Sequence, residues 1–353
     1  RISGTTSWGL ASVFRNTPGT GVNPDYLDEL EQWARTLWQS LRQDFRQRLR
    51  DGWIRECHGD LHLRNLAWID DRPVAFDCIE FNPNLSHIDV LCDIAFLVMD
   101  LQDRQQQRLA NRFLNTYLEY TGDYRQLQLL PYYQAYRALV RAKVTAIRLG
   151  QADLEDADVV RAEFNSYLQL ARSYGNAPRP AVILTCGLSG SGKTTVTSEL
   201  LECFDAIRIR SDVERKRHFG LAALQSGKAQ PGAGIYDASA HQQTYDQLAS
   251  LARRLLAAGR RVIVDATALR YEQRLLFRLL AKEMDCGFAI IECLAPVDVL
   301  RQRLDSRRGD ASDAGVEVLD AQLREHSADG LVAPDEQVCT VRVTTHRPVD
   351  GAV

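Results

Sequence analysis

The segment Gly187–Thr194, with the sequence GLSGSGKT, constrains the fold more than any other part of the chain. It fits the pattern G-x-x-x-x-G-K-[ST], in which glycines let backbone amides surround a phosphate. We expect the apolar run 181–186 before it to form a short buried strand, and the residues 194–204 after it to form a helix. A helix that starts at such a loop directs its positive end toward the phosphate. The sequence therefore predicts a nucleotide-binding site in a strand–loop–helix unit.

Segments typical of strands and helices alternate after Pro180. The expected strands are residues 181–186, 206–210, 261–265, 287–294 and 338–344. The expected helices are residues 193–204, 237–258, 270–285, 296–307 and 315–327. This alternation predicts an α/β domain in which a parallel five-stranded sheet is covered by helices on both faces.

The first half of the chain is predicted to be mostly helical. Apolar residues recur at helical spacing over 26–49, and most of the segment 88–174 also has helical character. Between them, two β-like runs at 66–69 and 73–76 flank an Asp-Asp turn, which indicates a hairpin. The stretch 176–180 contains two prolines and marks the boundary between the halves. The expected domains are residues 1–176 and 177–353.

Two acidic residues, Asp212 and Asp265, come at or just after the ends of predicted strands, where α/β enzymes bind their ligands. We expect Asp212 to contact the substrate and to act as the catalytic base for an acceptor hydroxyl. We expect Asp265 to contact the substrate or to join the Thr194 hydroxyl in binding Mg²⁺, while Lys193 holds the terminal phosphates of ATP. The alternative for either acid is a helix cap or a turn. The predicted nucleotide-binding residues are Gly187, Leu188, Ser189, Gly190, Ser191, Gly192, Lys193, Thr194 and Thr195.

Arginines of the second half are candidates for binding anionic groups. Arg215 is expected to hold a polar or anionic substrate. Arg301, Arg307 and Arg308 are expected to close over the transferred phosphoryl group and to stabilise its charge. Arg301 and Arg308 lie seven residues apart, on one face if the helix continues, so they are favoured over Arg303. The alternative for each is a solvated helix face.

These motifs resemble the compact P-loop kinases that are grouped with zeta-toxin-like, gluconate-kinase-like and polynucleotide-kinase-like proteins. The resemblance covers about residues 180–345. It depends on the segments Gly187–Thr195, Ser211–Arg215, Val264–Thr267 and Arg307–Asp313. It implies ATP-dependent phosphorylation of a hydroxyl group and does not specify the acceptor.

A second motif lies in the first half, where His58, Gly59, Asp60 and Asn65 form the pattern H-G-D-x-x-x-x-N. Asp77 follows on the predicted hairpin. These residues resemble the aminoglycoside phosphotransferase and choline kinase families, which have a eukaryotic-kinase-like fold. The resemblance covers about residues 24–174. It implies that Asp60 accepts the hydroxyl proton and that Asn65 and Asp77 bind Mg²⁺.

An active kinase of that fold needs an N-terminal lobe with a nucleotide-covering loop and a lysine on a strand. No lysine precedes Lys143, so this second ATP site is incomplete in the sequence as given. Because the chain starts at Arg1 rather than Met, we expect a fragment from which this lobe is missing. The alternative is a degenerate module that supports the P-loop kinase. The joint pattern resembles bacterial two-part proteins, in which a phosphotransferase-like region precedes a P-loop kinase or AAA family ATPase.

Composition limits the partners of the chain. Its net charge of −3 disfavours long nucleic acid, and no apolar run is long enough to cross a bilayer. The eight cysteines form no C-x-x-C pair, which favours free thiols in a reducing cytoplasm. We therefore expect a cytoplasmic protein, and the oligomeric state stays open.

Together the motifs predict a kinase that uses ATP and Mg²⁺ to phosphorylate a hydroxyl of a small molecule or nucleotide, with its chemistry in the second half. Two alternatives stay open. One is a regulatory switch that binds and hydrolyses ATP without a small acceptor. The other is a phosphotransferase whose active site is the H-G-D-x-x-x-x-N motif of the first half.

Overall fold

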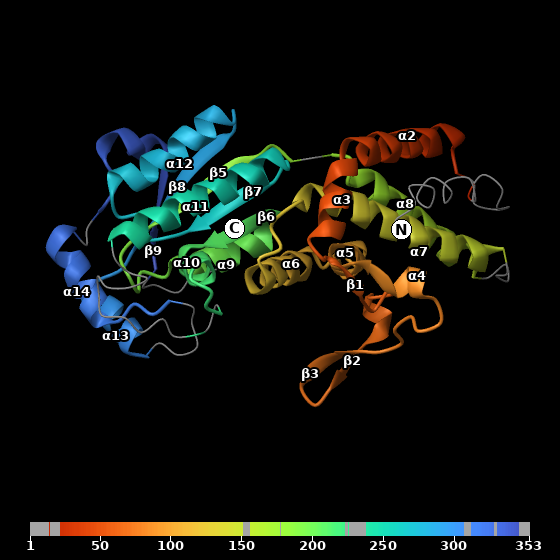
Figure 1. Cartoon of the computed structure of the whole chain (residues 1–353), viewed down its shortest axis with the longest axis horizontal. Coiled ribbons are helices and arrows are strands. Elements are labelled where there is room, and N and C mark those ends of the chain that lie inside the picture. The colour runs from red at the N-terminus through yellow and green to blue at the C-terminus, as the bar shows by residue number, and fades with distance from the viewer. Residues whose placement is uncertain are drawn as a thin grey trace. The chain divides into compact units, whose positions relative to one another are not determined.

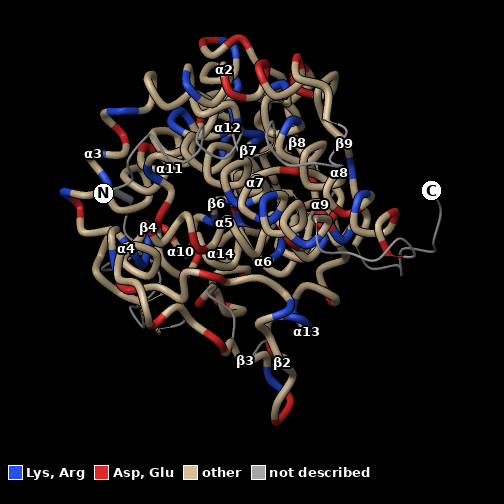
Figure 2. The backbone as a smooth tube through the Cα atoms, turned by 90° about the vertical axis from the view of Figure 1, so that its right-hand side faces the viewer, with Lys and Arg blue, Asp and Glu red and all other residues tan. Residues whose placement is uncertain are grey.

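The computed structural model (Figure 1) describes Phe14 and residues 22–150, 156–176, 178–222, 225, 238–306, 312–327 and 330–345. The chain divides into two compact units. Unit 1 comprises Arg1–Leu114 and Gln126–Ala177, and unit 2 comprises Asn115–Arg125 and Pro178–Val353. Basic and acidic residues are mixed along the chain trace (Figure 2). Among the described residues, no helix combines the length and the apolar character needed to span a lipid bilayer.

Unit 1 is mostly helical. Its described helices are α2 (Pro24–Ser40), α3 (Arg42–Arg50), α4 (Pro83–Ser86), α5 (Val90–Asp103), the first part of α6 (Gln107–Thr121), α7 (Leu130–Leu149) and α8 (Ala157–Ser173). Short 3₁₀ turns are η1 (Leu63–Asn65) and η2 (Leu127–Leu129). Two antiparallel strand pairs are β1 (Ile54–Glu56) with β4 (His87–Asp89), and β2 (Leu66–Ile69) with β3 (Arg72–Ala75). The β2–β3 pair confirms the predicted hairpin.

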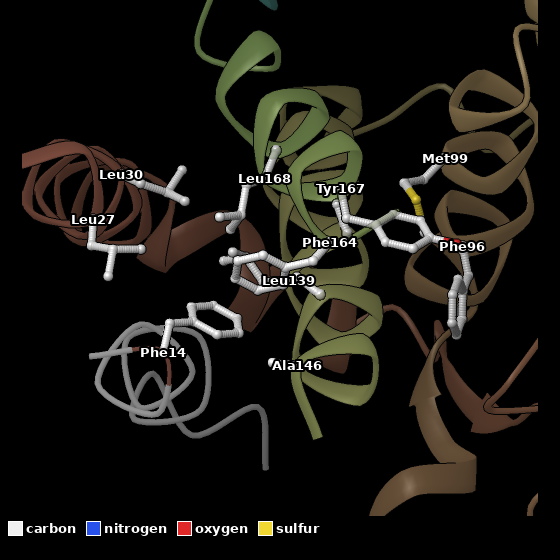
Figure 3. Close-up of a cluster of buried hydrophobic side chains, with 13 residues drawn as sticks. Phe14, Leu27, Leu30, Phe96, Met99, Leu139, Ala146, Phe164, Tyr167 and Leu168 are labelled. Atoms are coloured by element: carbon white, nitrogen blue, oxygen red, sulfur yellow. The ribbon is translucent and has the colours of Figure 1, made fainter. Parts of the chain in front are cut away.

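The core of unit 1 lies between α2, α5, α7 and α8, which all contribute buried apolar side chains to one cluster. Phe96 and Met99 of α5 are fully buried together with Leu139 of α7 and Phe164 of α8 (Figure 3). Leu27 of α2 belongs to the same cluster. This packing holds α5 in place, and α5 in turn supports the H-G-D-x-x-x-x-N loop described below.

Unit 2 contains the predicted parallel sheet. Its strands are β5 (Ala181–Cys186), β6 (Ala206–Arg210), β7 (Arg261–Asp265), β8 (Gly287–Leu294) and β9 (Thr340–Thr344), in the order β6-β7-β5-β8-β9. Its described helices are α9 (Lys193–Cys203), α10 (Ser211–His218), α11 (Ala238–Ala257), α12 (Tyr271–Glu283), α13 (Val297–Ser306) and α14 (Val316–Glu325), with the 3₁₀ turn η4 (Pro334–Cys339) before β9. The α/β class and the five parallel strands are thus confirmed.

The central strand β5 and its neighbour β7 are buried on both faces. Successive side chains, which point to opposite faces, are fully buried in both strands: Leu184 and Thr185 in β5, and Val262 and Ile263 in β7. This is the usual pattern of a parallel sheet between two helical layers. Helix α9 contacts β5, β6 and β7, whereas α11 contacts β7 and α12 contacts β5 and β8. The connection from β5 to β6 crosses the sheet in the opposite direction to those from β6 to β7 and from β7 to β8. Because such crossovers are right-handed, α9 lies on one face and α11 and α12 lie on the opposite face. The carboxyl ends of β5, β6 and β7 therefore meet at one edge of the sheet.

Candidate functional site

The loop between β5 and α9 has the close backbone approach that a phosphate cradle requires. Gly187 and Gly190 have positive φ angles of 152° and 83°. A Cβ at Gly187 would lie 2.6 Å from the carbonyl oxygen of Cys293, and one at Gly190 would lie 2.9 Å from that of Leu300. Only glycine avoids both overlaps, so the loop can turn tightly ahead of the helix N-terminus.

Lys193, the first residue of α9, folds back over this loop. Its Nζ donates to the carbonyl oxygens of Gly187 at 3.0 Å and Leu188 at 2.9 Å. Burial lowers the pKa of Lys193, and the nearby carboxylate of Asp265 opposes that shift. A partly desolvated ammonium that is bonded to neutral carbonyls is stabilised when anionic phosphate oxygens replace them. The lysine is therefore placed to exchange its loop carbonyls for a bound phosphate.

Thr194 and Asp265 form a pair of oxygen donors beside Lys193. Thr194 Oγ1 donates to Asp265 Oδ2 at 2.9 Å, and Thr197 Oγ1 donates to the same oxygen at 3.4 Å. In the part of the chain that the structure describes, no group of three or more His, Cys, Asp or Glu side chains could hold a metal. Mg²⁺ is usually bound by one or two protein oxygens together with substrate phosphates and water. The pair therefore fits a Mg²⁺ ion that arrives with a nucleotide.

The candidate residues surround one cavity of about 760 Å³, a volume typical of small-molecule sites. Asp212, at the start of α10, lines it together with Lys193, Thr194 and Asp265. Arg215, one helical turn later, donates to Asp212 Oδ1 at 3.2 Å and so orients this carboxylate. Their catalytic and substrate roles stay predictions. Of the other residues predicted to bind nucleotide, the lining includes Ser189, Gly190, Gly192 and Thr195 but not Gly187, Leu188 or Ser191.

Helix α13 brings a different arginine to the cavity from the one that the sequence favours. Arg303 lines the cavity and donates to the carbonyl oxygen of Gly190 at 3.3 Å. Arg301 is exposed, pairs with Asp320 at 2.8 Å and is not among the lining residues. Two residues rotate a helix by about 200°, so the two arginines face opposite sides. The other two arginines predicted for this role lie outside the described residues: Arg307 and Arg308.

Arg210 is a further cavity residue that motif comparison does not identify. It ends β6, lines the cavity, and its Nε lies 3.7 Å from Asp265 Oδ2. A usable signal is nonetheless present in the sequence of β6, because Arg208 and Arg210 alternate with isoleucines and so share one face of the strand. Two arginines on one face at the end of a strand, next to Asp212, indicate a basic side of the site.

The H-G-D-x-x-x-x-N motif of unit 1 forms a separate ordered loop. Asn65 Nδ2 donates to Asp60 Oδ2 at 3.1 Å and to its backbone oxygen at 3.0 Å. His62 Nε2 lies 3.3 Å from the same carboxylate. The contact with His62 is the main reason that the pKa of Asp60 is lowered. Asp60 is therefore ionised at neutral pH, as a general base must be.

Two carboxylates of α5 hold the backbone of this loop. Asp93 accepts from the amides of His58 at 3.0 Å and Gly59 at 3.1 Å. Asp100 accepts from the amide of Leu63 at 2.8 Å. Neither acid belongs to the motif. Their spacing could still have identified them in the sequence, because two acids seven residues apart lie on one face of an apolar helix and can bond the same loop. Burial raises the pKa of Asp93.

Asp77 is exposed and follows β3 with a left-handed φ of 60°. The preceding residue, Phe76, ties this turn to the loop: its amide donates to the carbonyl oxygen of Asn65 at 3.0 Å. His58 Nε2 donates to the carbonyl oxygen of Phe76 at 2.8 Å. The structure therefore places Asp77 beside the loop, while metal binding by Asp77 and Asn65 stays a prediction.

Family models match both halves of the chain. The model of the phosphotransferase enzyme family matches residues 10–130. A model described as an AAA domain matches residues 182–328. The chain therefore combines a phosphotransferase-family region with a P-loop region, which confirms the two-part organisation that the motifs indicate.

Longer proteins match most of the chain. Uncharacterized proteins of Mycobacterium bovis and Mycobacterium tuberculosis are 32% identical to it over 309 residues, which is 87% of this chain. The match covers 61% of each of these proteins, so the chain spans less than two thirds of their length.

Solved kinase structures match about half of the chain. An unliganded sugar kinase from Janibacter sp. HTCC2649 is 20% identical, with 48% of this chain and 88% of that chain covered and a TM-score of 0.36. A gluconokinase from Sinorhizobium meliloti 1021 is 22% identical, with 48% and 85% covered and a TM-score of 0.32. The APS kinase CysC of Mycobacterium tuberculosis, in complex with AMPPNP and APS, is 20% identical, with 49% and 92% covered and a TM-score of 0.32.

Proposed function

We propose that this chain is an ATP- and Mg²⁺-dependent phosphotransferase whose chemistry takes place in unit 2. The observation that carries the proposal is the cavity at the carboxyl edge of the sheet, which Lys193, Thr194, Asp265 and Asp212 all line. Phosphoryl transfer depends on positioning and on charge stabilisation, so it needs phosphate-binding groups, oxygen ligands for a metal and an acid near the acceptor in one volume. This cavity offers all three.

The residues of the site take separate roles in this mechanism. Lys193 and the loop amides would hold the phosphates of ATP, and Thr194 and Asp265 would hold Mg²⁺. The metal, when bound, supplies positive charge that stabilises the transferred phosphoryl group. Asp212 accepts the proton of the acceptor hydroxyl. The oxygen of that hydroxyl forms the new bond to the γ-phosphorus, while the bond between the γ-phosphorus and the ADP oxygen breaks. Arg303 supplies a further positive charge beside the loop.

We infer that the acceptor is a small molecule or a nucleotide with a free hydroxyl group. The cavity has the size of a small-molecule site. Arg215 is buried and is not among the residues that line the cavity, so its contact with Asp212 supports a role in orienting the candidate base rather than in binding the acceptor. A long nucleic acid would call for an extended basic surface, whereas the chain has a net charge of −3 and mixes its basic and acidic residues (Figure 2).

ATP turnover by the full chain, with and without a panel of sugars, alcohols and nucleosides, tests the proposal. We expect one acceptor class to accelerate ADP release. Lys193→Ala should weaken nucleotide binding at least about tenfold, and Asp212→Asn should slow acceptor-dependent turnover about 10²- to 10⁴-fold with nucleotide affinity unchanged. Glu283→Gln, which removes an exposed partner of Arg253 away from the cavity, is the matched control.

Two results would contradict this assignment. Acceptor phosphorylation that survives in Asp212→Asn would exclude Asp212 as the base. Turnover that no acceptor accelerates would instead favour a regulatory ATPase without a small acceptor.

The ordered loop of unit 1 supports a second candidate, a phosphotransferase site at Asp60. The specific observation is that Asn65 and His62 both contact the Asp60 carboxylate and so hold this candidate base in place. Asp60→Asn and Lys193→Ala, assayed side by side, separate the candidates. Activity lost only in Asp60→Asn would place the chemistry in unit 1 and show that the proposal for unit 2 is wrong.

A further inference from the structure

The segment Asn115–Arg125 covers the outer edge of β6, although it precedes that strand by a long stretch of sequence. Asn115 Nδ2 donates to the carbonyl oxygen of Ala206 at 3.0 Å, and Asn115 Oδ1 accepts from the amide of Arg208 at 2.8 Å. Among the strands that the structure describes, β6 is the first in the sheet order, so no described strand pairs with its outer edge. One amide side chain thus bonds this edge as a neighbouring strand would. The segment is therefore built into unit 2.

Glu119, one helical turn after Asn115 in α6, faces two arginines of β6. Its Oε1 lies 2.7 Å from Arg208 Nε and 2.6 Å from Arg208 Nη2. Its Oε2 lies 3.8 Å from Arg210 Nη1. The exposed fractions of the three side chains are small: 16% for Glu119, 9% for Arg208 and 13% for Arg210. Charges with so little contact with water interact strongly.

Both arginines extend from Glu119 to the nucleotide site. Arg208 Nη1 donates to Ser198 Oγ at 2.9 Å and to Thr197 Oγ1 at 3.2 Å, in the helix that starts at the phosphate loop. Arg210 lines the cavity, and its Nε lies 3.7 Å from Asp265 Oδ2. The guanidinium of Arg210 thus lies between Glu119 and Asp265, at nearly equal distances of 3.8 Å and 3.7 Å from their carboxylates.

We infer that Glu119 is a positioning residue for the metal side of the nucleotide site. This inference rests on the proposed function. The carboxylate of Glu119 attracts Arg210 and so keeps it from closing on Asp265. A closed Arg210–Asp265 pair would occupy the carboxylate oxygen that accepts from Thr194 and that Mg²⁺ needs. Removing the charge of Glu119 therefore favours the closed pair and weakens metal binding.

The affinity of the full chain for ADP, measured by titration calorimetry with Mg²⁺ and again with EDTA, tests this. The ratio of the two affinities isolates the contribution of the metal, because a lost phosphate contact changes both values alike. In Glu119→Gln we expect the ratio to fall about tenfold. In the double variant Glu119→Gln/Arg210→Gln it should return toward that of the unsubstituted chain, since no guanidinium remains to occupy Asp265. Glu283→Gln, away from the cavity, should leave the ratio unchanged.

Each other outcome decides against the inference. An unchanged ratio in Glu119→Gln, or a fall that the double variant does not reverse, would overturn it. A purely structural role of Glu119 would lower stability and both affinities without altering their ratio.

If Glu119→Gln does not fold, the ratio of the two ADP affinities is measured on Arg210→Gln alone, and this result tests the inference. A ratio at or above that of the unsubstituted chain supports the inference, and a lower ratio overturns it. The proposed function fails separately, if the unsubstituted chain binds no ADP or if Lys193→Ala binds it equally well.

Discussion

Gly190→Ala should destabilise unit 2 through two separable effects. Gly190 has a φ of 83°, a conformation that costs alanine about 1–2 kcal/mol. The added Cβ would also lie 2.9 Å from the carbonyl oxygen of Leu300 and 3.3 Å from Leu304 Cγ. The Leu300 oxygen belongs to the backbone of α13, so only a shift of that helix or of the loop relieves the overlap, at a cost of about 1–3 kcal/mol. The expected loss is about 2–5 kcal/mol.

Gly220→Ala is the matched control, because it isolates the backbone effect. Gly220 also has a positive φ, of 72°, but an added Cβ there would meet no atom of the described residues within 4 Å. We expect it to lower the free energy of unfolding by about 1–2 kcal/mol. Both glycines belong to unit 2, so urea denaturation followed by circular dichroism compares them in one transition. The difference between the two variants measures the contact of the loop with α13.

The displacement of the loop in Gly190→Ala should also weaken nucleotide binding. Because the loop must move away from α13, we expect the affinity for ADP to fall at least about tenfold in Gly190→Ala. It should stay within about twofold in Gly220→Ala, whose position is not among the residues that line the cavity. If the two variants unfold with free energies that agree within about 0.5 kcal/mol, the close packing against α13 is refuted as the reason for glycine at this position.

Three further predictions concern single side chains. Burial, helped by Arg215, lowers the pKa of His241 to about 4 from 6.5. The unfolded chain therefore binds a proton below pH 6.5 that the folded chain rejects, so stability is lost as the pH falls toward 4. This loss should be larger than in His241→Gln by about 1–3 kcal/mol, discounted for partial exposure, and equal pH profiles of the two urea titrations would contradict it. Asn115→Ala should cost unit 2 about 1–3 kcal/mol in the same assay, because it removes two bonds to the edge of β6, and a loss below about 0.5 kcal/mol would contradict the docking. Asp93→Asn should cost unit 1 about 3–5 kcal/mol in thermal unfolding, because it leaves the buried Arg137 without this carboxylate, and an unchanged melting temperature would contradict it.

The architecture of unit 2 could be predicted well because its local signals agree. Each central strand is buried on both faces and therefore appears as a continuous apolar run, as in β5 and β7. The phosphate loop then specifies where one strand ends and the next helix starts. The predicted start of β9 is two residues too early. The strand starts at Thr340 rather than at residue 338, because Pro334–Cys339 forms a 3₁₀ turn before it. Helix α10 was not predicted, since its eight residues are too few to show an apolar period.

In the candidate site, too, some residues could be placed from the sequence and others could not. Asp212 and Asp265 could be placed because the ends of parallel strands share one edge of the sheet, so position in the chain gives position in space. The arginines of α13 could not be placed in this way. Whether Arg301 or Arg303 faces the loop depends on the rotation of the helix about its axis, and this is set by the packing of Leu300 and Leu304 against Leu188. That packing is tertiary and leaves no local signal.

The membership of Asn115–Arg125 in unit 2 is the clearest case of structure that sequence patterns cannot show. The bond from Asn115 to Ala206 spans 91 residues, and that from Arg208 to Glu119 spans 89. A fragment that starts at residue 178, as the proline-containing boundary suggests, loses both side chains. Its Arg208 then lacks the Glu119 carboxylate, and the edge of β6 lacks the Asn115 amide, which favours pairing with other chains. Residues 178–353 alone should therefore aggregate more readily than the full chain in light scattering, and Arg208→Leu should reduce this only in part, because the open edge remains.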